Sequence, residues 1–365
     1  MTFGEVLLQR GLFAEDRTGT AAMAFYDTAI DRLGLRSWCE DGAADTPMSM
    51  AQLLAQANGS NAEGGEALPF PSLDTLHEAC GAIPQTRDMT AGVEAAFLAV
   101  KDGLKFVLDP LTQPLSWLLE AALYVFTAVP WWVLIPLLIW ATWAATRRRA
   151  VTGFVAVVFL FFGLIDHLDV ALQTLSIIFV CTGLCVLFGV PIGILMSRSD
   201  RTQRVMLPVL DMLQTLPSFV YLIPLIFLFS VTEPKLYGIA IILYAIVPVI
   251  RLTDLGIRLV DRDVIEAADA FGMSERQKLF GVQLPLALPN IMAGVNQTIM
   301  MSLAMVVIAS LVSAPGLGVL VLRGIRNLEL GVGLVAGFGI VLLAVVLDRC
   351  SKAALQRIDP AHKSQ

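Results

Sequence analysis

Seven stretches of apolar residues, separated by charged segments, follow one another along the chain after residue 120. The hydrocarbon core of a bilayer is about 30 Å thick and takes roughly 20 apolar residues of helix to cross. The pattern therefore predicts an all-α, polytopic membrane protein with about seven transmembrane helices. We place them at residues 123–146, 150–166, 170–196, 207–231, 236–255, 290–314 and 330–348.

The composition agrees with a membrane protein. Apolar residues make up 56% of the 365 residues and charged residues only 15%, whereas a soluble domain is about 25% charged. The chain has no strongly basic surface of the kind that nucleic-acid binding requires, so we expect no nucleic-acid partner.

The positive charges predict the orientation of the chain. If the N-terminus lies outside, the inner loops and the C-terminal tail carry 15 Lys and Arg, and the short outer loops carry three, namely Lys235, Arg323 and Arg326. Cytoplasmic loops are enriched in Lys and Arg. We therefore expect an extracytoplasmic N-terminus and a cytoplasmic C-terminus.

This orientation places an acidic segment outside the membrane. Residues 1–110 contain 7 Lys and Arg against 16 Asp and Glu. Within them, residues 58–71 have the composition of a linker. Residues 92–119 alternate apolar and charged clusters, which suits either a helix in the membrane interface or a small soluble helical bundle. Cys39 and Cys80 would be able to pair in an oxidising compartment.

Polar residues inside the predicted helices are few. Gln214 and Thr215 lie in the fourth predicted helix, and Asn296, Gln297 and Thr298 lie in the sixth. Unsatisfied polar groups are costly in lipid, so these side chains must face protein or water. Two interpretations stay open: the residues line a translocation path, or they join helices by hydrogen bonds.

Cysteine and histidine form no metal-binding pattern. Cys181 and Cys185 are four residues apart in an apolar helix, and the three histidines, His77, His167 and His362, are scattered. Buried apolar cysteines are the simpler interpretation. We expect no metal site.

The most informative segment is the long inner loop at about residues 252–284. Asp263 and Glu266 have the spacing of a capping box and predict a helix that begins at Val264. Gly272 is suited to the left-handed conformation that ends a helix. Ser274 and Gln277 form a second capping-box pattern, and the short helix that they begin is expected to end at Pro285.

Together these signals predict a helix–turn–helix on the cytoplasmic side of the membrane. Ala267, Ala268 and Ala270 make its first helix thin, and Phe271 and Met273 lie at its tip. A thin, partly apolar helix fits a groove in another protein, although an idle connector would have the same propensities.

The spacing of this loop resembles the EAA loop of ABC importer permeases. Glu266-Ala267-Ala268 is followed by three residues, Gly272, nine residues and then Val282-Gln283-Leu284-Pro285. The family pattern has isoleucine where Val282 stands. Residues 115–350 also look like the permeases of glycine betaine and proline betaine importers, and an outward N-terminal tail is similar to that subfamily.

The resemblance implies a type I ABC importer permease in a bacterial inner membrane, taking up quaternary ammonium osmolytes such as glycine betaine, proline betaine or choline. It implies a homodimer, two copies of a separate ATPase that binds ATP and magnesium, and an extracytoplasmic substrate-binding protein. It assigns ATPase coupling to Glu266, Ala267, Ala268, Phe271, Gly272, Leu284 and Pro285. No cofactor is expected on this chain.

The implied organisation has four parts. They are an outer tail at residues 1–115, two accessory helices at 116–166, a permease core at 167–350 with the coupling loop at 252–285, and a cytoplasmic tail at 351–365.

Two alternatives come from other classes: a secondary carrier or channel that works alone, and a purely structural membrane scaffold. The sequence has no phosphate-binding loop of the G-x-x-x-x-G-K-[ST] type and no nucleophile–base pattern. We therefore expect a non-catalytic transport subunit.

Overall fold

The computed structural model describes residues 18–36, 39, 80 and 86–358. Every element within these residues is a helix. The chain divides into two compact units, residues 1–100 and 101–365, and each is described by itself. The predicted linker at 58–71 lies outside the described residues, as do His77, His362 and Lys363.

The first unit contains helix α2 (Thr18–Leu33) and a disulfide between Cys39 and Cys80. Ile30 of α2 packs against both cysteines, and all three side chains are buried. The pairing considered from the sequence is thus present in the structure.

The second unit begins within a long helix, which breaks before a hairpin of two shorter helices. Helix α6 (Thr86–Ala128) is followed by α7 (Trp131–Thr146) and α8 (Arg149–Leu164). The axes of α6 and α7 are bent by 112°. The prediction of one continuous helix at 123–146 was wrong. Pro130 has no backbone N–H to continue the helix, and its own backbone is extended, so α6 and α7 are separate helices.

Four continuous helices among the described residues are long and apolar enough to cross a membrane. They are α9 (Leu168–Arg198), α12 (Pro234–Arg258), the rod at Glu275–Val312 that contains α15 (Leu284–Ala309), and the first part of α17 (Leu330–Ile358). Counting each bent helix pair as one span gives up to six, and α8 is a shorter apolar helix. The predictions at 170–196 and 236–255 agree closely with α9 and α12.

The predicted helix at 207–231 is also broken. Helix α10 (Asp200–Thr215) ends before Pro217, and the chain continues as η2 (Ser218–Tyr221) and α11 (Leu222–Leu228) at an angle of 102°. Pro217 lacks the backbone N–H that would continue α10, which explains the break.

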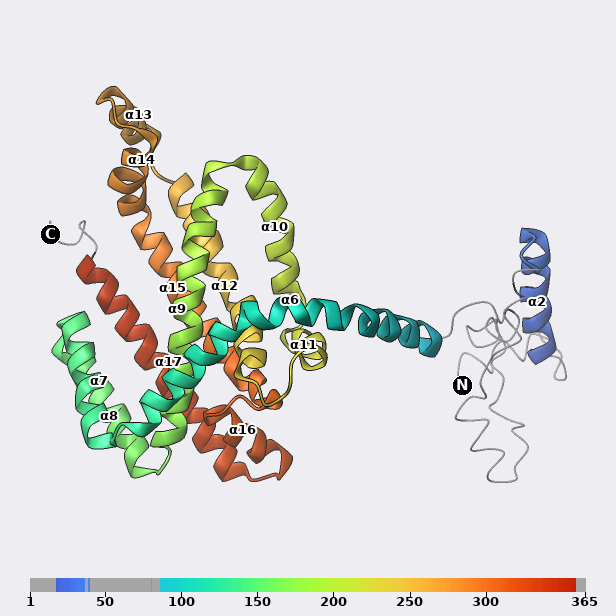
Figure 1. The fold of residues 1–365 in the computed structure, drawn as a ribbon, viewed down its shortest axis with the longest axis horizontal. Helices are drawn as coiled ribbons and strands as arrows, with labels where there is room; N and C mark the ends of the chain where they lie inside the picture. The colour runs from blue at the N-terminus through green and yellow to red at the C-terminus, as the bar shows by residue number, and fades with distance from the viewer. Residues whose placement is uncertain (1–17, 37–38, 40–79, 81–85, 359–365) are drawn as a thin grey trace, which may run out of the picture. The chain divides into compact units, whose positions relative to one another are not determined.

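Helices α9, α12 and α15 form the centre of the second unit (Figure 1). Their backbones approach closely at glycines. A Cβ atom on Gly193 of α9 would lie 2.7 Å from the Ile250 carbonyl oxygen of α12, and one on Gly294 of α15 would lie 3.0 Å from Val249 Cα. Small residues permit this close packing, which is the main source of helix association in lipid.

A helical hairpin of α16 (Leu317–Arg326) and α17 packs beside this centre. The Thr174 hydroxyl of α9 accepts a hydrogen bond from Leu317 N at 2.9 Å, which satisfies one free N–H at the start of α16. A Cβ on Gly324 would lie 2.5 Å from Gly333 Cα. Among the glycines of α17, Gly333 and Gly339 meet neighbouring helices, whereas Gly331 and Gly337 face open space.

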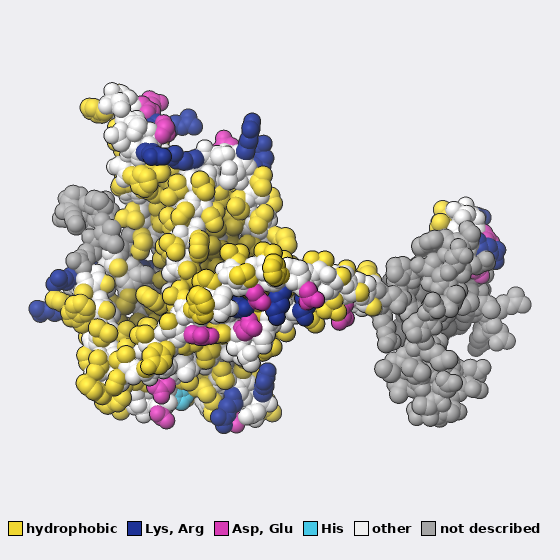
Figure 2. Space-filling view, viewed as in Figure 1, with side chains coloured by type: hydrophobic (Ala, Val, Ile, Leu, Met, Phe, Trp, Pro, Cys, Tyr) yellow, Lys and Arg dark blue, Asp and Glu magenta, His cyan; other side chains and the backbone are white. Residues whose placement is uncertain are grey.

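Apolar side chains cover most of the visible flank of the second unit, and Lys and Arg side chains gather beside the loop that contains the EAA spacing (Figure 2). This distribution fits helices that face lipid along their length and water at their ends.

Candidate functional site

The loop after α12 forms a helical hairpin of α13 (Arg262–Ala270) and α14 (Glu275–Lys278). The cap of α13 is Asp261, whose carboxylate accepts from Asp263 N at 3.0 Å. The predicted start at Val264, with Asp263 as the cap, was therefore wrong. Asp261 has the extended backbone of a cap residue and lies two positions nearer the end of α12, so the helix begins earlier.

The turn between the two helices agrees with the prediction. Gly272 has φ +75, and its N–H donates to the Asp269 carbonyl at 2.9 Å. Met273 N donates to the Ala268 carbonyl at 3.1 Å. These bonds close the end of α13 in the way that a left-handed glycine permits, at a position where a side chain would be strained.

The capping box that begins α14 is also confirmed. Ser274 N donates to Gln277 Oε1 at 2.8 Å, and Gln277 N donates to Ser274 Oγ at 3.4 Å. Two free N–H groups at the helix start are thereby satisfied.

The sequence predicted that Pro285 ends this second helix, and the structure shows that the helix continues past it. A π-helical turn at Leu279–Gln283 (η3) joins α14 to α15, and Pro285 lies in the first turn of α15. Leu284 N donates to Leu279 O, five residues back. The wider turn accommodates the missing N–H of proline without breaking the helix, and the result is one rod from Glu275 to Val312.

Two basic residues hold the hairpin in place. Lys278 Nζ lies 2.7 Å from Asp269 Oδ1 of α13 and 2.5 Å from Glu275 Oε1. Arg198, at the end of α9, donates from Nη2 to the Glu275 carbonyl at 3.1 Å. The contact of Lys278 with Asp269 links the two arms of the hairpin, and the contact of Arg198 links the hairpin to a membrane helix.

The tip of the hairpin is exposed in the described structure. Phe271 is 87% exposed, and Glu266, Ala267 and Gly272 are exposed as well. Ala268 is buried and faces inward. A large apolar side chain in this position offers an anchor for another protein.

An arginine that the sequence analysis did not single out connects three segments near the base of the hairpin. Arg258, at the end of α12, donates to Asp200 Oδ1 at 2.7 Å, to Asp254 Oδ1 at 2.9 Å and to the Met196 carbonyl at 2.9 Å. Gln203 donates to the other oxygen of Asp254 at 2.7 Å. The spacing of four between Asp254 and Arg258 was visible in the sequence, but the contacts with α9 and α10 depend on the fold.

The polar residues considered for a translocation path do not all meet. Asn296 of α15 donates to Asp348 Oδ1 of α17 at 3.0 Å and accepts from Ser351 Oγ at 2.7 Å. A hollow of about 400 Å³ beside it also includes Gln297. Gln214 and Thr215 lie at the end of α10, before the bend, and neither lines this hollow.

Thr298 of α15 is fully buried, and its hydroxyl has no hydrogen-bond partner in the described structure. The hydrogen bonds of Asn296, by contrast, connect α15 to α17.

Cys181 and Cys185 are both buried, which confirms their interpretation as apolar core residues. Among the residues that the structure describes, no group of three or more His, Cys, Asp or Glu is placed to hold a metal ion.

Comparison with known proteins places this architecture in a family. Residues 189–363 match the model described as binding-protein-dependent transport system inner membrane component. The chain is 36% identical over 336 residues to the glycine betaine/proline betaine transport system permease protein ProW of Escherichia coli (strain K12), covering 87% of this chain and 90% of that protein.

Two further relatives agree. The protein of the same name from Salmonella typhimurium is 48% identical over 192 residues, covering 52% of this chain and 54% of that protein. The glycine betaine transport system permease protein OpuAB of Bacillus subtilis (strain 168) is 38% identical over 258 residues, covering 70% and 86%. The chain belongs to the family of binding-protein-dependent transport system inner membrane components, in the group of ABC transporter permeases that contains ProW and OpuAB.

Proposed function

We propose that this chain is the membrane-spanning permease of an ATP-driven importer for a quaternary ammonium osmolyte, with glycine betaine, proline betaine and choline as the leading substrates. The names of its relatives support the substrate class. The observation that carries the mechanism is the hairpin of α13 and α14, which presents an exposed Phe271 beyond the membrane helices.

The hairpin is the proposed docking point for a separate ATPase, two copies of which bind ATP and magnesium. Glu266, Ala267 and Ala268 lie on α13, and Phe271 and Gly272 form the turn. Leu284 and Pro285, at the start of α15, connect this docking point directly to a membrane helix. When ATP draws the two ATPases together, the docked hairpins move with them, and the attached helices reorient as rigid bodies.

We propose seven membrane crossings in a bacterial inner membrane. The four continuous helices, the two bent pairs and the short α8 account for them. The excess of Lys and Arg in alternate loops supports an outer N-terminus and an inner C-terminus. The Cys39–Cys80 disulfide supports the outer location of the first unit, because disulfides persist in oxidising compartments.

The proposed parts are the outer tail at 1–115, the accessory helices at 116–166, the core at 167–350 with its coupling loop at 252–285, and the inner tail at 351–365. The charged and apolar mixture of α6 before its bend suits a helix that lies in the membrane interface.

Two copies of the chain would enclose the translocation path, to which a soluble extracytoplasmic protein delivers the substrate. Gln214, Thr215, Gln297 and Thr298 remain proposed lining residues. Asn296 is proposed at the edge of the path, where its bonds to α17 hold α15 in place.

Reconstitution tests the proposal. The chain is placed in liposomes with the ATPase that co-purifies with it, and uptake of labelled glycine betaine is measured with and without ATP and the delivery protein. Uptake should require ATP, and Gly272→Asp should abolish it while the chain still inserts. Gly34→Asp is the matched control, because Gly34 also has a positive φ in open space but lies in the first unit.

Uptake by the chain without any ATPase would establish a carrier that works alone. Full uptake by Gly272→Asp would refute docking at the hairpin.

A further inference from the structure

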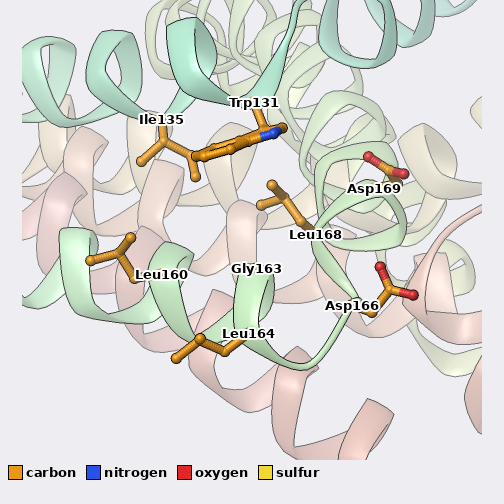
Figure 3. A pocket seen from close by; sticks show the side chains of 8 residues that line it. All are labelled: Trp131, Ile135, Leu160, Gly163, Leu164, Asp166, Leu168 and Asp169. Atoms are coloured by element: carbon orange, nitrogen blue, oxygen red, sulfur yellow. The ribbon is translucent and has the colours of Figure 1, made fainter.

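A hollow of about 530 Å³ lies between α7, α8 and the first turn of α9 (Figure 3). It is separate from the hairpin and from the residues proposed for the translocation path. The residues that line it are Trp131, Ile135, Leu160, Gly163, Leu164, Asp166, Leu168 and Asp169.

The lining has an apolar side and an acidic side. In Figure 3 the carboxylates of Asp166 and Asp169 lie together on one side, and Ile135 and Leu160 lie on the other. The indole of Trp131 extends across the upper part between them. The hollow therefore combines an aromatic face, two negative charges and an aliphatic surface.

Neither carboxylate forms an ion pair within the described residues. No Lys or Arg lines the hollow, and in the part of the chain that the structure describes neither Asp166 nor Asp169 has an ion-pair partner. The neighbouring His167 directs Nδ1 to the Ile165 carbonyl at 2.6 Å, back toward its own turn. A cation in the hollow would meet two carboxylates without an ion-pair partner in the described structure, although the start of α9 partly stabilises the charge of Asp169.

The depth of the hollow in the bilayer follows from the helices around it. Residues 165–167 connect two apolar helices, α8 and α9, so the turn lies at a membrane surface whichever way the chain is oriented. Helix α8 has 16 residues and is about 24 Å long, shorter than the roughly 30 Å hydrocarbon core. Lipid must adapt to a helix that is too short, so lipid headgroups meet this end of the hairpin of α7 and α8.

These observations identify a chemical class of ligand. An ammonium group is attracted both to the face of tryptophan and to carboxylates, and an acyl chain matches the aliphatic side, where Leu164 is 86% exposed. We propose that the hollow binds a phospholipid with an ammonium headgroup, phosphatidylethanolamine, with its ammonium between Trp131 and the two aspartates. An anionic headgroup without an ammonium would be repelled by the same carboxylates.

The proposed binding of phosphatidylethanolamine is tested by measuring which lipids the protein retains. The full chain is inserted into membranes of equal phosphatidylethanolamine and phosphatidylglycerol and extracted in mild detergent, and the retained lipids are counted by native mass spectrometry. The wild type should retain phosphatidylethanolamine over phosphatidylglycerol by roughly three- to tenfold. Asp166→Asn with Asp169→Asn should remove most of this preference.

Two variants make the result specific. Glu120→Gln removes a negative charge from an exposed position on α6, outside the hollow, and should keep the preference. Trp131→Leu keeps both aspartates and an apolar side chain but removes the aromatic face, and should weaken the preference. Trp131→Leu therefore tests the proposed lipid site even if the double substitution fails to fold.

Equal retention of the two lipids by the wild type, or an unchanged preference in both hollow variants, would overturn the proposal. Displacement of phosphatidylethanolamine by glycine betaine would overturn it too, because the hollow would then take a soluble ammonium compound. These outcomes do not depend on ATP-driven uptake, so the proposed function stands or falls separately.

Discussion

The ammonium of Lys235, in the first turn of α12, lies 2.7 Å from Asp109 Oδ1 of α6, although 126 residues separate the two in the sequence. The Lys235 side chain is only 4% exposed, and Glu233 Oε2 lies 2.8 Å from the same ammonium. One turn further along α12, Leu119 of α6 packs over Gly238, where a Cβ would lie 2.7 Å from it. This pair and this packing attach α6 to the core.

We expect Lys235→Met to weaken the attachment of α6. A buried charge pair that loses one partner is strongly destabilised, whereas an exposed pair contributes little. Because Asp109 is about one-third exposed, the expected loss is roughly 1–3 kcal/mol. Faster proteolytic cleavage within residues 101–109 of the purified chain would report it.

A double-mutant cycle provides the control. Asp109→Leu combined with Lys235→Met should recover part of the loss, because Asp109 then leaves no unpaired charge and only Glu233 has lost its partner. Identical cleavage rates in the wild type, the two single variants and the double variant would show that the Lys235–Asp109 pair does not attach α6 to the core.

Two glycines on α9 give a matched test of close packing. Gly193→Ala brings a Cβ to 2.7 Å from the Ile250 carbonyl oxygen, so the backbone of α9 or α12 must move. Gly183→Ala meets nothing within 4 Å. We expect Gly193→Ala to lower thermal stability in detergent by several degrees or more, and Gly183→Ala to leave it unchanged or raise it, since alanine favours helix by about 1 kcal/mol. Equal stability of the two would refute the packing of α9 on α12.

Arg258→Lys should disconnect the base of the hairpin from α9 and α10. A lysine is a single point charge and cannot reach Asp200, Asp254 and the Met196 carbonyl together, as the arginine fork does. We expect ATP hydrolysis by the assembled transporter to persist while less substrate moves per ATP.

The matched control for Arg258→Lys is Arg201→Lys, which makes the same exchange at an exposed position of α10. It should leave the ratio of transport to hydrolysis unchanged. A ratio that falls equally in both variants would show that Arg258 has no special part in coupling.

Asn296 distinguishes helix joining from substrate contact. Asn296→Ala removes the bonds to Asp348 and Ser351, so it should lower thermal stability by an amount that corresponds to about 1–3 kcal/mol and leave the KM of uptake unchanged. Gln297→Ala is the comparison, since Gln297 is exposed and lines the adjacent hollow. A raised KM in Asn296→Ala with unchanged stability would place Asn296 on the path instead.

The parts of the fold that the sequence predicted are those determined by local chemistry. Long apolar runs located α9 and α12 within a few residues, and the glycine and capping pattern at Gly272 and Ser274 predicted the hairpin turn. In each case the residues that determine the structure are neighbours in the chain, so their pattern can be seen without the fold.

The errors arose where one local signal competed with another. Pro285 was expected to end a helix, but a π turn accommodated it. Asp263 was expected to cap α13, but Asp261 caps the helix two residues earlier, by accepting from Asp263 N. An apolar run was expected to cross the membrane unbroken, but Pro130 bent it.

Contacts between distant helices could not be predicted. The pairing of Lys235 with Asp109, and the contacts of Arg258 with Asp200 and Met196, depend on how helices pack, and a single sequence contains no signal for them. The same is true of the hollow at Trp131, whose lining comes from three helices.

The π turn at Leu279–Gln283 has a mechanical consequence. Because the helix continues through this turn, the segment from Glu275 to Val312 is one unbroken helical rod of 38 residues, about 57 Å long. We expect a sideways push at its hairpin end to tilt the far end as well, because no break in the helix lies between them. Pro285, which the sequence pattern marks as a helix end, is thus compatible with one continuous helix that leads from the hairpin into the membrane-spanning α15.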